Sequence, residues 1–293
     1  MKRCIAFLFI YLLSYQADGQ LKKKFSVGLM TGYHQENFQW SVAGNIHGEN
    51  PDIYSELIWR NIGGPCVAGH LHWNPWRRLV LAADFDYAFI TQGRVSDMDY
   101  LGNHRTVNSY EGHFAAHEGN VQAYHFHIGY PILHTHLVEL IPSVGYSIQL
   151  QKLYMLDPGV GLNSTYATNW NGVSARLAAV FRLSAKWQLT NEFTAAQLTF
   201  HATANWNLVK TFQHPLSFED KANGVGITDR ISIDYRLSHH LMLHTGFGYT
   251  YQQTGKGVDR LYLANGAMPV TQFNGATRKA MQFTAGVQVG LGK

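Results

Sequence analysis

The stretch MQFTAGVQVGL, residues 281–291, decides the fold of this chain because its alternation has no exception. Every odd-numbered residue from Met281 to Leu291 is apolar or small, and every even-numbered one is polar or glycine. Successive side chains of a β-strand point to opposite faces, so this segment presents one apolar and one polar face. The pattern recurs in residues 144–150, 225–237 and 241–251.

Two classes of protein contain such strands. A water-soluble sandwich buries the apolar face, whereas a membrane barrel turns it towards lipid. Tight connections at residues 72–78, 182–187 and 236–241 alternate with long polar stretches, which we interpret as loops, at residues 45–51, 102–120, 152–171, 205–224 and 253–278. Short turns on one side and long loops on the other are typical of outer-membrane barrels. We therefore predict an all-β, transmembrane, antiparallel up-and-down barrel of about ten strands, with the soluble sandwich as the alternative.

Composition and targeting agree with the membrane barrel. Charged residues make up 14% of the chain, against about 25% in average soluble proteins. Trp73, Trp76 and Trp187 lie near expected strand ends, as in the aromatic girdles of barrels. Residues 4–13 form a run of apolar residues that follows a basic start and is too short to span a bilayer as a helix.

We expect residues 1–19 to be a signal peptide and residues 20–293 to form the barrel domain. The bacterial outer membrane is the predicted location. Cys4 leaves with the leader, and Cys66 alone cannot form an intramolecular disulfide. The formal net charge of +4 includes the basic residues of the leader and of residues 22–24, so it gives no indication of nucleic-acid binding.

Asp97 and Asp99 end the strand-like stretch FDYAFITQGRVSDMDY, residues 85–100. Their spacing places both carboxylates on one face, where they repel each other when ionised. In this position, together with SELIWR at residues 55–60 and TGYHQE at residues 31–36, the pair resembles the omptin family of outer-membrane proteases. The resemblance implies a ten-stranded barrel with an extracellular groove, an Asp-x-Asp pair that binds the attacking water, and Glu36 as an attractor of a basic substrate side chain.

The resemblance also implies a catalytic histidine across the groove, oriented by an aspartate two residues earlier. The corresponding segment, residues 201–224, contains no Asp-x-His, and His214 is preceded at that spacing by Phe212. Loss of the orienting carboxylate costs about 10⁴-fold in rate in serine proteases. The sequence therefore predicts a surface barrel with a degenerate protease-like groove and a binding or structural role. The alternative is an omptin-type aspartic endopeptidase that uses Asp97, Asp99 and His214.

Two His-x-His pairs, His70 with His72 and His125 with His127, are expected to point into the barrel with His244. Such pairs are able to ligate a transition metal, but barrel interiors are polar in any case. We assign no metal and no cofactor. The charged side chains expected in the lumen, including two on the second strand, should pair with opposite charges and fill it. They are Asp84, Asp86, Arg176, Arg230, Asp234 and Arg236, with Glu56 and Arg60 on the second strand. The expected partners are outer-membrane lipid, lipopolysaccharide by resemblance to omptins, and an extracellular peptide or protein.

Overall fold

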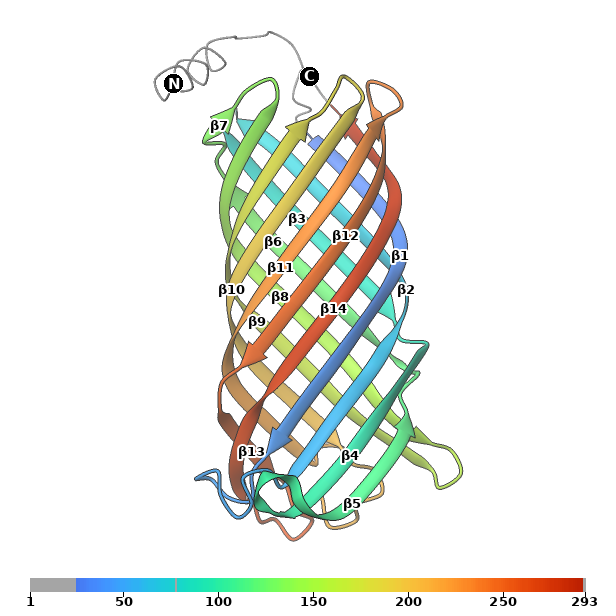
Figure 1. Cartoon of the computed structure of the whole chain (residues 1–293), viewed down its shortest axis with the longest axis vertical. Coiled ribbons are helices and arrows are strands. Elements are labelled where there is room, and N and C mark those ends of the chain that lie inside the picture. Colours follow the sequence, from blue (N-terminus) through green and yellow to red (C-terminus); the bar gives the residue numbers. More distant parts are fainter. Residues whose placement is uncertain (1–24, 77, 292–293) are drawn as a thin grey trace, which may run out of the picture.

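The computed structural model describes residues 25–76 and 78–291, which form a closed barrel (Figure 1). In chain order the elements are β1 Phe25–Val42, β2 Ser55–Trp76, β3 Leu79–Phe89, β4 Gln92–Gly102, the 3₁₀ turn η1 Asn103–Arg105, β5 Thr106–Ala115, β6 Gly119–Gly129, β7 Leu133–His134, β8 Val138–Asp157, β9 Leu162–Arg182, β10 Trp187–Asn205, β11 Phe218–Arg236, β12 Leu241–Thr254, β13 Gly257–Leu261 and β14 Val270–Leu291.

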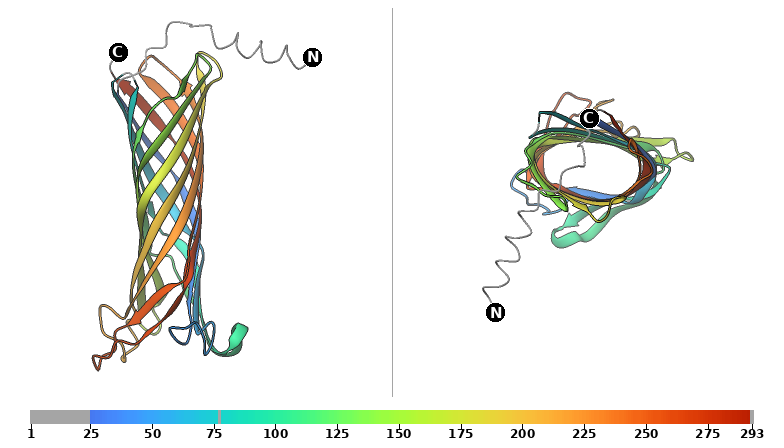
Figure 2. Two further views of the ribbon diagram at one scale, coloured as in Figure 1. Left: turned by 90° about the vertical axis from the view of Figure 1, so that its left-hand side faces the viewer. Right: turned by 90° about the horizontal axis from the view of Figure 1, so that it is seen from above.

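The barrel closes because β1 pairs antiparallel with β2 on one side and with β14 on the other. Phe25 lies opposite Trp73 and Leu291, and the register runs to Val42 with one irregularity on each side. The pairs β3–β4, β5–β6 and β12–β13 each act as one interrupted wall strand, which gives ten antiparallel strands around the ring seen in Figure 2. The predicted fold class is confirmed, and closure leaves no free edge between the first and last strands.

The first and last described residues lie at the same end of the barrel (Figure 1). This end also carries the short turns, so it is the periplasmic end by the general rule for outer-membrane barrels. β4, β5 and β13 lie at the opposite, extracellular end. The predicted signal peptide, residues 1–19, lies outside the described residues.

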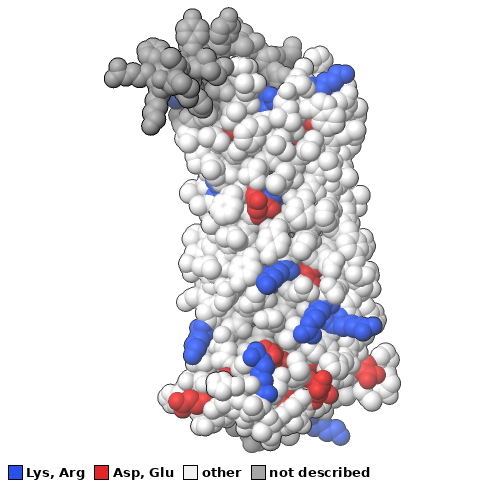
Figure 3. Space-filling model, viewed as in Figure 1, with Lys and Arg blue, Asp and Glu red and all other residues white. Residues whose placement is uncertain are grey.

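The outer surface changes chemistry along the barrel axis. On β1 the outward residues are mostly apolar in the periplasmic half, with Val27, Leu29 and Tyr33 beside a single threonine, and are polar in the extracellular half, from Gln35 to Gln39. On the face shown in Figure 3, charged side chains likewise gather over the extracellular half. An apolar belt followed by a polar wall is expected where a barrel leaves the bilayer. Within the described residues, no helix is long and apolar enough to cross a membrane.

The interior changes in the opposite sense. The extracellular half is filled by a buried aromatic core, made up of Phe38, Trp40, Trp59, Tyr166, Trp170, Phe200, Phe218 and Phe273. Tyr166 stacks on Trp40 with ring centroids 5.2 Å apart and on Trp59 at 5.8 Å. Such pairs add about 0.5–1.5 kcal/mol each beyond the apolar area they bury. The extracellular half of the barrel is therefore built like a soluble protein, with an apolar core inside and polar residues outside.

The predicted loops are too long. Residues 102–120 contain β5 and the start of β6, and residues 152–171 are strand except for the turn at 158–161. Of residues 205–224 only 206–217 form a loop, and residues 253–278 include β13 and the first part of β14. In the extracellular half the barrel wall extends beyond the lipid, and its outward residues face water and are polar. The alternation of apolar and polar residues therefore disappears from the sequence, although the strands continue.

Glu56 and Arg60 do not point into the lumen as predicted. β2 is interrupted at Asn61, whose φ of 53° is in the left-handed region, and the register shifts between Arg60 and Gly63. This β-bulge reverses which residues face inward. Trp59 is consequently buried in the core, while Arg60 is exposed and Glu56 pairs with Arg105 at 2.6 Å.

Candidate functional site

Asp97 and Asp99 lie together on the inward face of β4, at the extracellular end. Asp97 is opposite Leu57 of β2 and Gly112 of β5, and Asp99 is opposite Ser55 and Tyr110. Asp97 is 8% exposed, and Asp99 is partly buried. The structure therefore places the two carboxylates on a common face, as their spacing predicts.

The environment of the pair favours the protonated form of Asp97. Burial and then the neighbouring Asp99 carboxylate raise the pKa of Asp97 to about 7. Burial also raises the pKa of Asp99, although a hydrogen bond from Ser55 partly offsets this. At neutral pH Asp97 is thus partly protonated, because burial and the neighbouring carboxylate both disfavour its charged form.

His214 lies in the loop 206–217 between β10 and β11. Its Nδ1 is 2.9 Å from Oδ1 of Asn205, the last residue of β10. Within the described chain, no hydrogen bond or ion pair connects His214 with either Asp97 or Asp99, and the neighbours that act on the two carboxyl groups are Asp99 on Asp97 and Ser55 on Asp99. The structure therefore supplies an amide in place of the orienting carboxylate and leaves the histidine separate from the acid pair.

Glu36 lies inside the barrel and is 1% exposed. Its Oε2 is 2.7 Å from Nε of Arg278 and 3.0 Å from Nε2 of His34, and Oε1 accepts a hydrogen bond from Gln151. Arg278 also donates to Gln252. The Glu36 carboxylate is thus already paired with a basic side chain of the protein itself, that of Arg278. Its role towards a substrate stays a prediction.

A second carboxyl pair, Asp220 with Asp259, was not found from the sequence. The two residues face each other across β11 and β13, and they are 0% and 3% exposed. Tyr166 donates to Asp220 at 2.6 Å, and Thr271 donates to Asp259 at 2.8 Å. Burial and then Asp259 raise the pKa of Asp220 well above its usual value, while burial raises that of Asp259 to about 6. The pairing joins residues 39 positions apart, so no local signal could reveal it.

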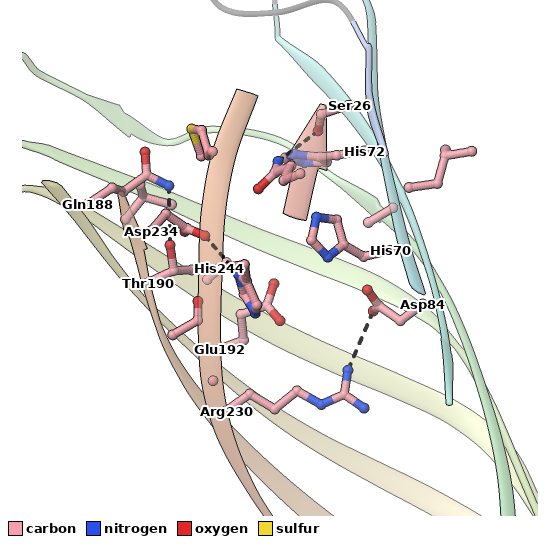
Figure 4. A pocket seen from close by; sticks show the side chains of 18 of the residues that line it. Ser26, His70, His72, Asp84, Gln188, Thr190, Glu192, Arg230, Asp234 and His244 are labelled. Carbon is pink, nitrogen blue, oxygen red and sulfur yellow. Dashed lines mark hydrogen bonds and ion pairs between the residues drawn. The ribbon is translucent and has the colours of Figure 1, made fainter. Parts of the chain in front are cut away.

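The periplasmic half of the lumen encloses a cavity of about 910 Å³ (Figure 4). His70, His72, His127 and His244 line it, and it extends to the periplasmic turn at residues 238–240. The inward orientation predicted for these histidines is confirmed. Among the residues that the structure describes, no group of three or more His, Cys, Asp or Glu side chains is arranged to hold a metal ion.

Ion pairs line the cavity wall, as expected from the charges in the sequence. Arg176 is 2.7 Å from Asp84, and Arg230 is 2.7 Å from Asp86. Neither pair joins neighbouring strands: Asp84 and Asp86 lie on β3, whereas Arg176 lies on β9 and Arg230 on β11, across the ring from β3. The ion pairs therefore link separate parts of the wall through the lumen. Between this cavity and the aromatic core lies the network of Glu36 and Arg278, which separates the two halves.

The architecture and the location are those of a known group of proteins. The sequence profile of Pom, the Protochlamydia outer membrane protein family, matches residues 28–292. The chain belongs to this family. The match covers the described barrel except its first three residues, 25–27, and establishes a protein of the bacterial outer membrane. A search of curated protein sequences gives no match.

Solved structures were compared with this Pom-family barrel. The outer membrane protease OmpT from Escherichia coli has a TM-score of 0.77 with 11% sequence identity, over 95% of this chain and 100% of that chain. The translocator domain of autotransporter NalP from Neisseria meningitidis has a TM-score of 0.41 with 9% identity, over 98% and 95%. The first likeness shows an OmpT-like fold, whereas membership of the omptin family is not shown.

Proposed function

We propose that the protein is a non-enzymatic barrel of the cell surface whose extracellular end binds a partner, on an OmpT-like scaffold with a degenerate protease-like site. One observation carries the proposal: among the described residues, no hydrogen bond or ion pair links the acid pair Asp97 and Asp99 to His214, which is bonded to Asn205 instead. A general base needs to lie about 2.6–3.2 Å, or one water, from the proton that it removes. Outer-membrane lipid surrounds such a protein.

Supporting this, the extracellular end carries exposed apolar side chains in several connections. They are Ile46, Tyr54, Leu101, Val107, Val160, Leu208 and Met268. Exposed apolar residues on a rim surrounded by polar ones often mark protein interaction surfaces. The aromatic core below the rim gives this surface a rigid support.

The test is an activity assay on protein refolded in detergent with lipopolysaccharide, which omptins require. A dibasic fluorogenic peptide is added between pH 5 and 8. We expect no cleavage above the rate of the Asp97→Ala and Asp99→Ala variants. Cleavage that the Asp99→Ala change abolishes would contradict the proposal and support an endopeptidase.

The endopeptidase is the second candidate, and the raised pKa of Asp97 favours it. A carboxyl group that titrates near 7 is suited to proton transfer at neutral pH. In that case Asp97 and Asp99 would bind and polarise the attacking water, His214 would act as base, and Glu36 would attract a basic residue. Activity would then depend on the ionisation of Asp97 and change across pH 7.

A further inference from the structure

The hairpin of β4 and β5 has one free edge. β5 pairs with β4 over most of its length, but on its other side it pairs with β8 only through Ala115 and Leu156. Every residue from Thr106 to Glu111 is exposed, as is His113. Figure 1 shows this hairpin at the extracellular end, and Figure 2 shows it leaning away from the ring. The closed barrel therefore still contains an unpaired strand segment above the membrane.

The register identifies the backbone groups at this edge. Ala116 N–H donates to Gly93 at 3.1 Å, and Tyr100 N–H donates to Tyr54 on the opposite side of β4. Because antiparallel strands alternate the direction of their backbone groups, Asp97 and Gly112 form a hydrogen-bonded pair. The N–H and C=O groups of Glu111 and His113 consequently point away from β4, towards the free edge.

From Tyr110 to Ala115 the edge lacks the features that usually protect such strands, since the β-bulge of β5 lies before this segment, between Asn108 and Tyr110. The sequence of β5, TVNSYEGHFA, contains no proline, lysine or arginine. Its ionisable residues are Glu111 and His113, which are 3.0 Å apart and bonded to each other within the strand. Their mutual pairing leaves little net charge to repel a neighbouring strand.

The strand is complementary to itself about Gly112. An antiparallel copy centred on this residue places Tyr110 opposite Phe114, and Glu111 opposite His113, twice each. Aromatic pairs directly across two strands stabilise their pairing. Two glycines face each other at the centre, where the Tyr110 hydroxyl and the Phe114 ring already occupy the space a side chain would fill. The Tyr110 side chain is exposed, whereas the Phe114 ring packs partly against the core.

We propose that the free edge of β5 binds the same edge of a second copy of this chain, in an antiparallel register centred on Gly112. This inference rests on the proposed function, because it identifies the partner of the extracellular end. Glu111 and His113 of each copy exchange backbone hydrogen bonds with His113 and Glu111 of the other, which gives four in all for the register described.

The geometry of the pair determines how the two copies are oriented. The two-fold axis of an antiparallel strand pair is perpendicular to the sheet. Because the sheet here is a barrel wall, the two barrels point in opposite directions, as they do when two outer membranes face each other. The contact area of one strand pair is small compared with the roughly 800 Å² per partner of a stable complex. A single pair therefore binds weakly, and many pairs between two facing membranes strengthen the contact together.

Cysteine cross-linking tests the register in the full-length chain carrying Cys4→Ala and Cys66→Ala. Gly112 lies opposite itself in the proposed pair, so oxidation of the Gly112→Cys variant in detergent yields a disulfide-linked dimer. The Glu111→Cys and His113→Cys variants are matched controls. Each places its thiols diagonally, about 7–8 Å apart, and yields little dimer alone, whereas their mixture cross-links. Equal yields from all three single variants, or dimer from none, would overturn the proposal.

Sedimentation of the protein without added cysteines covers the case in which these variants do not fold. Glu111→Pro removes an edge N–H that β4 does not use, and Glu111→Ala removes only the side chain. We expect the proline variant alone to lose self-association. A monomeric unsubstituted protein, or equal loss in both variants, excludes pairing through the backbone. Peptide cleavage is a separate readout, so failure of the proposed function is distinguishable from failure of this pairing.

Discussion

Along β1 the residues that point into the barrel change from Ser26 and Met30 in the periplasmic half to Phe38 and Trp40 in the extracellular half. The outward residues change in the reverse order, from Leu29 to Gln39. Where lipid surrounds the wall, the interior is polar and holds a cavity of about 910 Å³. Where water surrounds it, the interior is an aromatic core. The medium around each half, lipid or water, therefore determines which interactions inside the barrel stabilise that half.

The strongest test of this comparison concerns the network between the halves. Arg278→Ala leaves the Glu36 carboxylate buried without its cation and removes the hydrogen bond to Gln252. We expect a loss of about 5 kcal/mol in the free energy of unfolding, at the upper end for broken buried pairs. Urea unfolding in detergent measures it. The double variant Arg278→Ala and Glu36→Gln should recover part of the loss. If it recovers none, the loss does not come from an uncompensated charge on Glu36.

Trp59→Ala tests the aromatic core itself. The indole is 1% exposed and contacts Phe38 and Tyr166, so its removal leaves a cavity in a packed region. We expect a loss of about 3–4 kcal/mol in the same unfolding experiment. His70→Ala is the matched change in the periplasmic half, where the side chain borders a cavity, and it should cost less than about 1 kcal/mol. Equal costs would mean that the two halves are not built differently.

The buried acid pair predicts a pH dependence for the extracellular half. The pKa of Asp259 is raised to about 6 in the fold, above its value of roughly 4 in an unfolded chain. Stability is then fully present below about pH 4 and is lost as the pH rises through 6. Asp259→Asn should therefore raise the free energy of unfolding by roughly 2 kcal/mol at pH 8 and leave it unchanged at pH 4. An equal effect at both pH values would exclude titration of this pair.

The smallest expected effect is at the rim. Arg105 and Glu56 are paired at 2.6 Å, but the arginine side chain is 51% exposed, so solvent screens the interaction. Arg105→Ala should cost about 0.5–1 kcal/mol and act locally, by faster hydrogen exchange in β4 and β5. Hydrogen exchange followed by mass spectrometry checks this. Destabilisation of the whole barrel would show that the hairpin is part of the core structure.

The periplasmic half could be predicted from the sequence because lipid imposes a strict alternation. Residues 281–291 and the inward histidines show the wall and its faces directly. The extracellular half of the wall could not be predicted in the same way. Its outer face meets water, which permits any polar residue, so the sequence of these strands resembles that of loops. The bulge at Asn61 reversed the faces of Glu56 and Arg60, and a single inserted residue leaves no mark in the pattern.

The candidate site was predictable only in part. Asp97 and Asp99 share a face because the period of a strand is fixed, and the sequence shows this. The bond between His214 and Asn205 depends on the conformation of the loop 206–217, and the pairing of Asp220 with Asp259 depends on the register between β11 and β13. A single sequence specifies neither the conformation of such a loop nor the register of two such strands.

Chemical labelling at His72 tests most directly whether the lumen is open to the periplasm and closed to the outside. The His72→Cys variant, in a chain with Cys66→Ala, is reconstituted in a bilayer, and a membrane-impermeant thiol reagent is added from one side at a time. Because His72 lines the periplasmic cavity, we expect labelling from the periplasmic side and none from the extracellular side. Comparable rates from both sides would show a continuous channel and contradict the filled extracellular half.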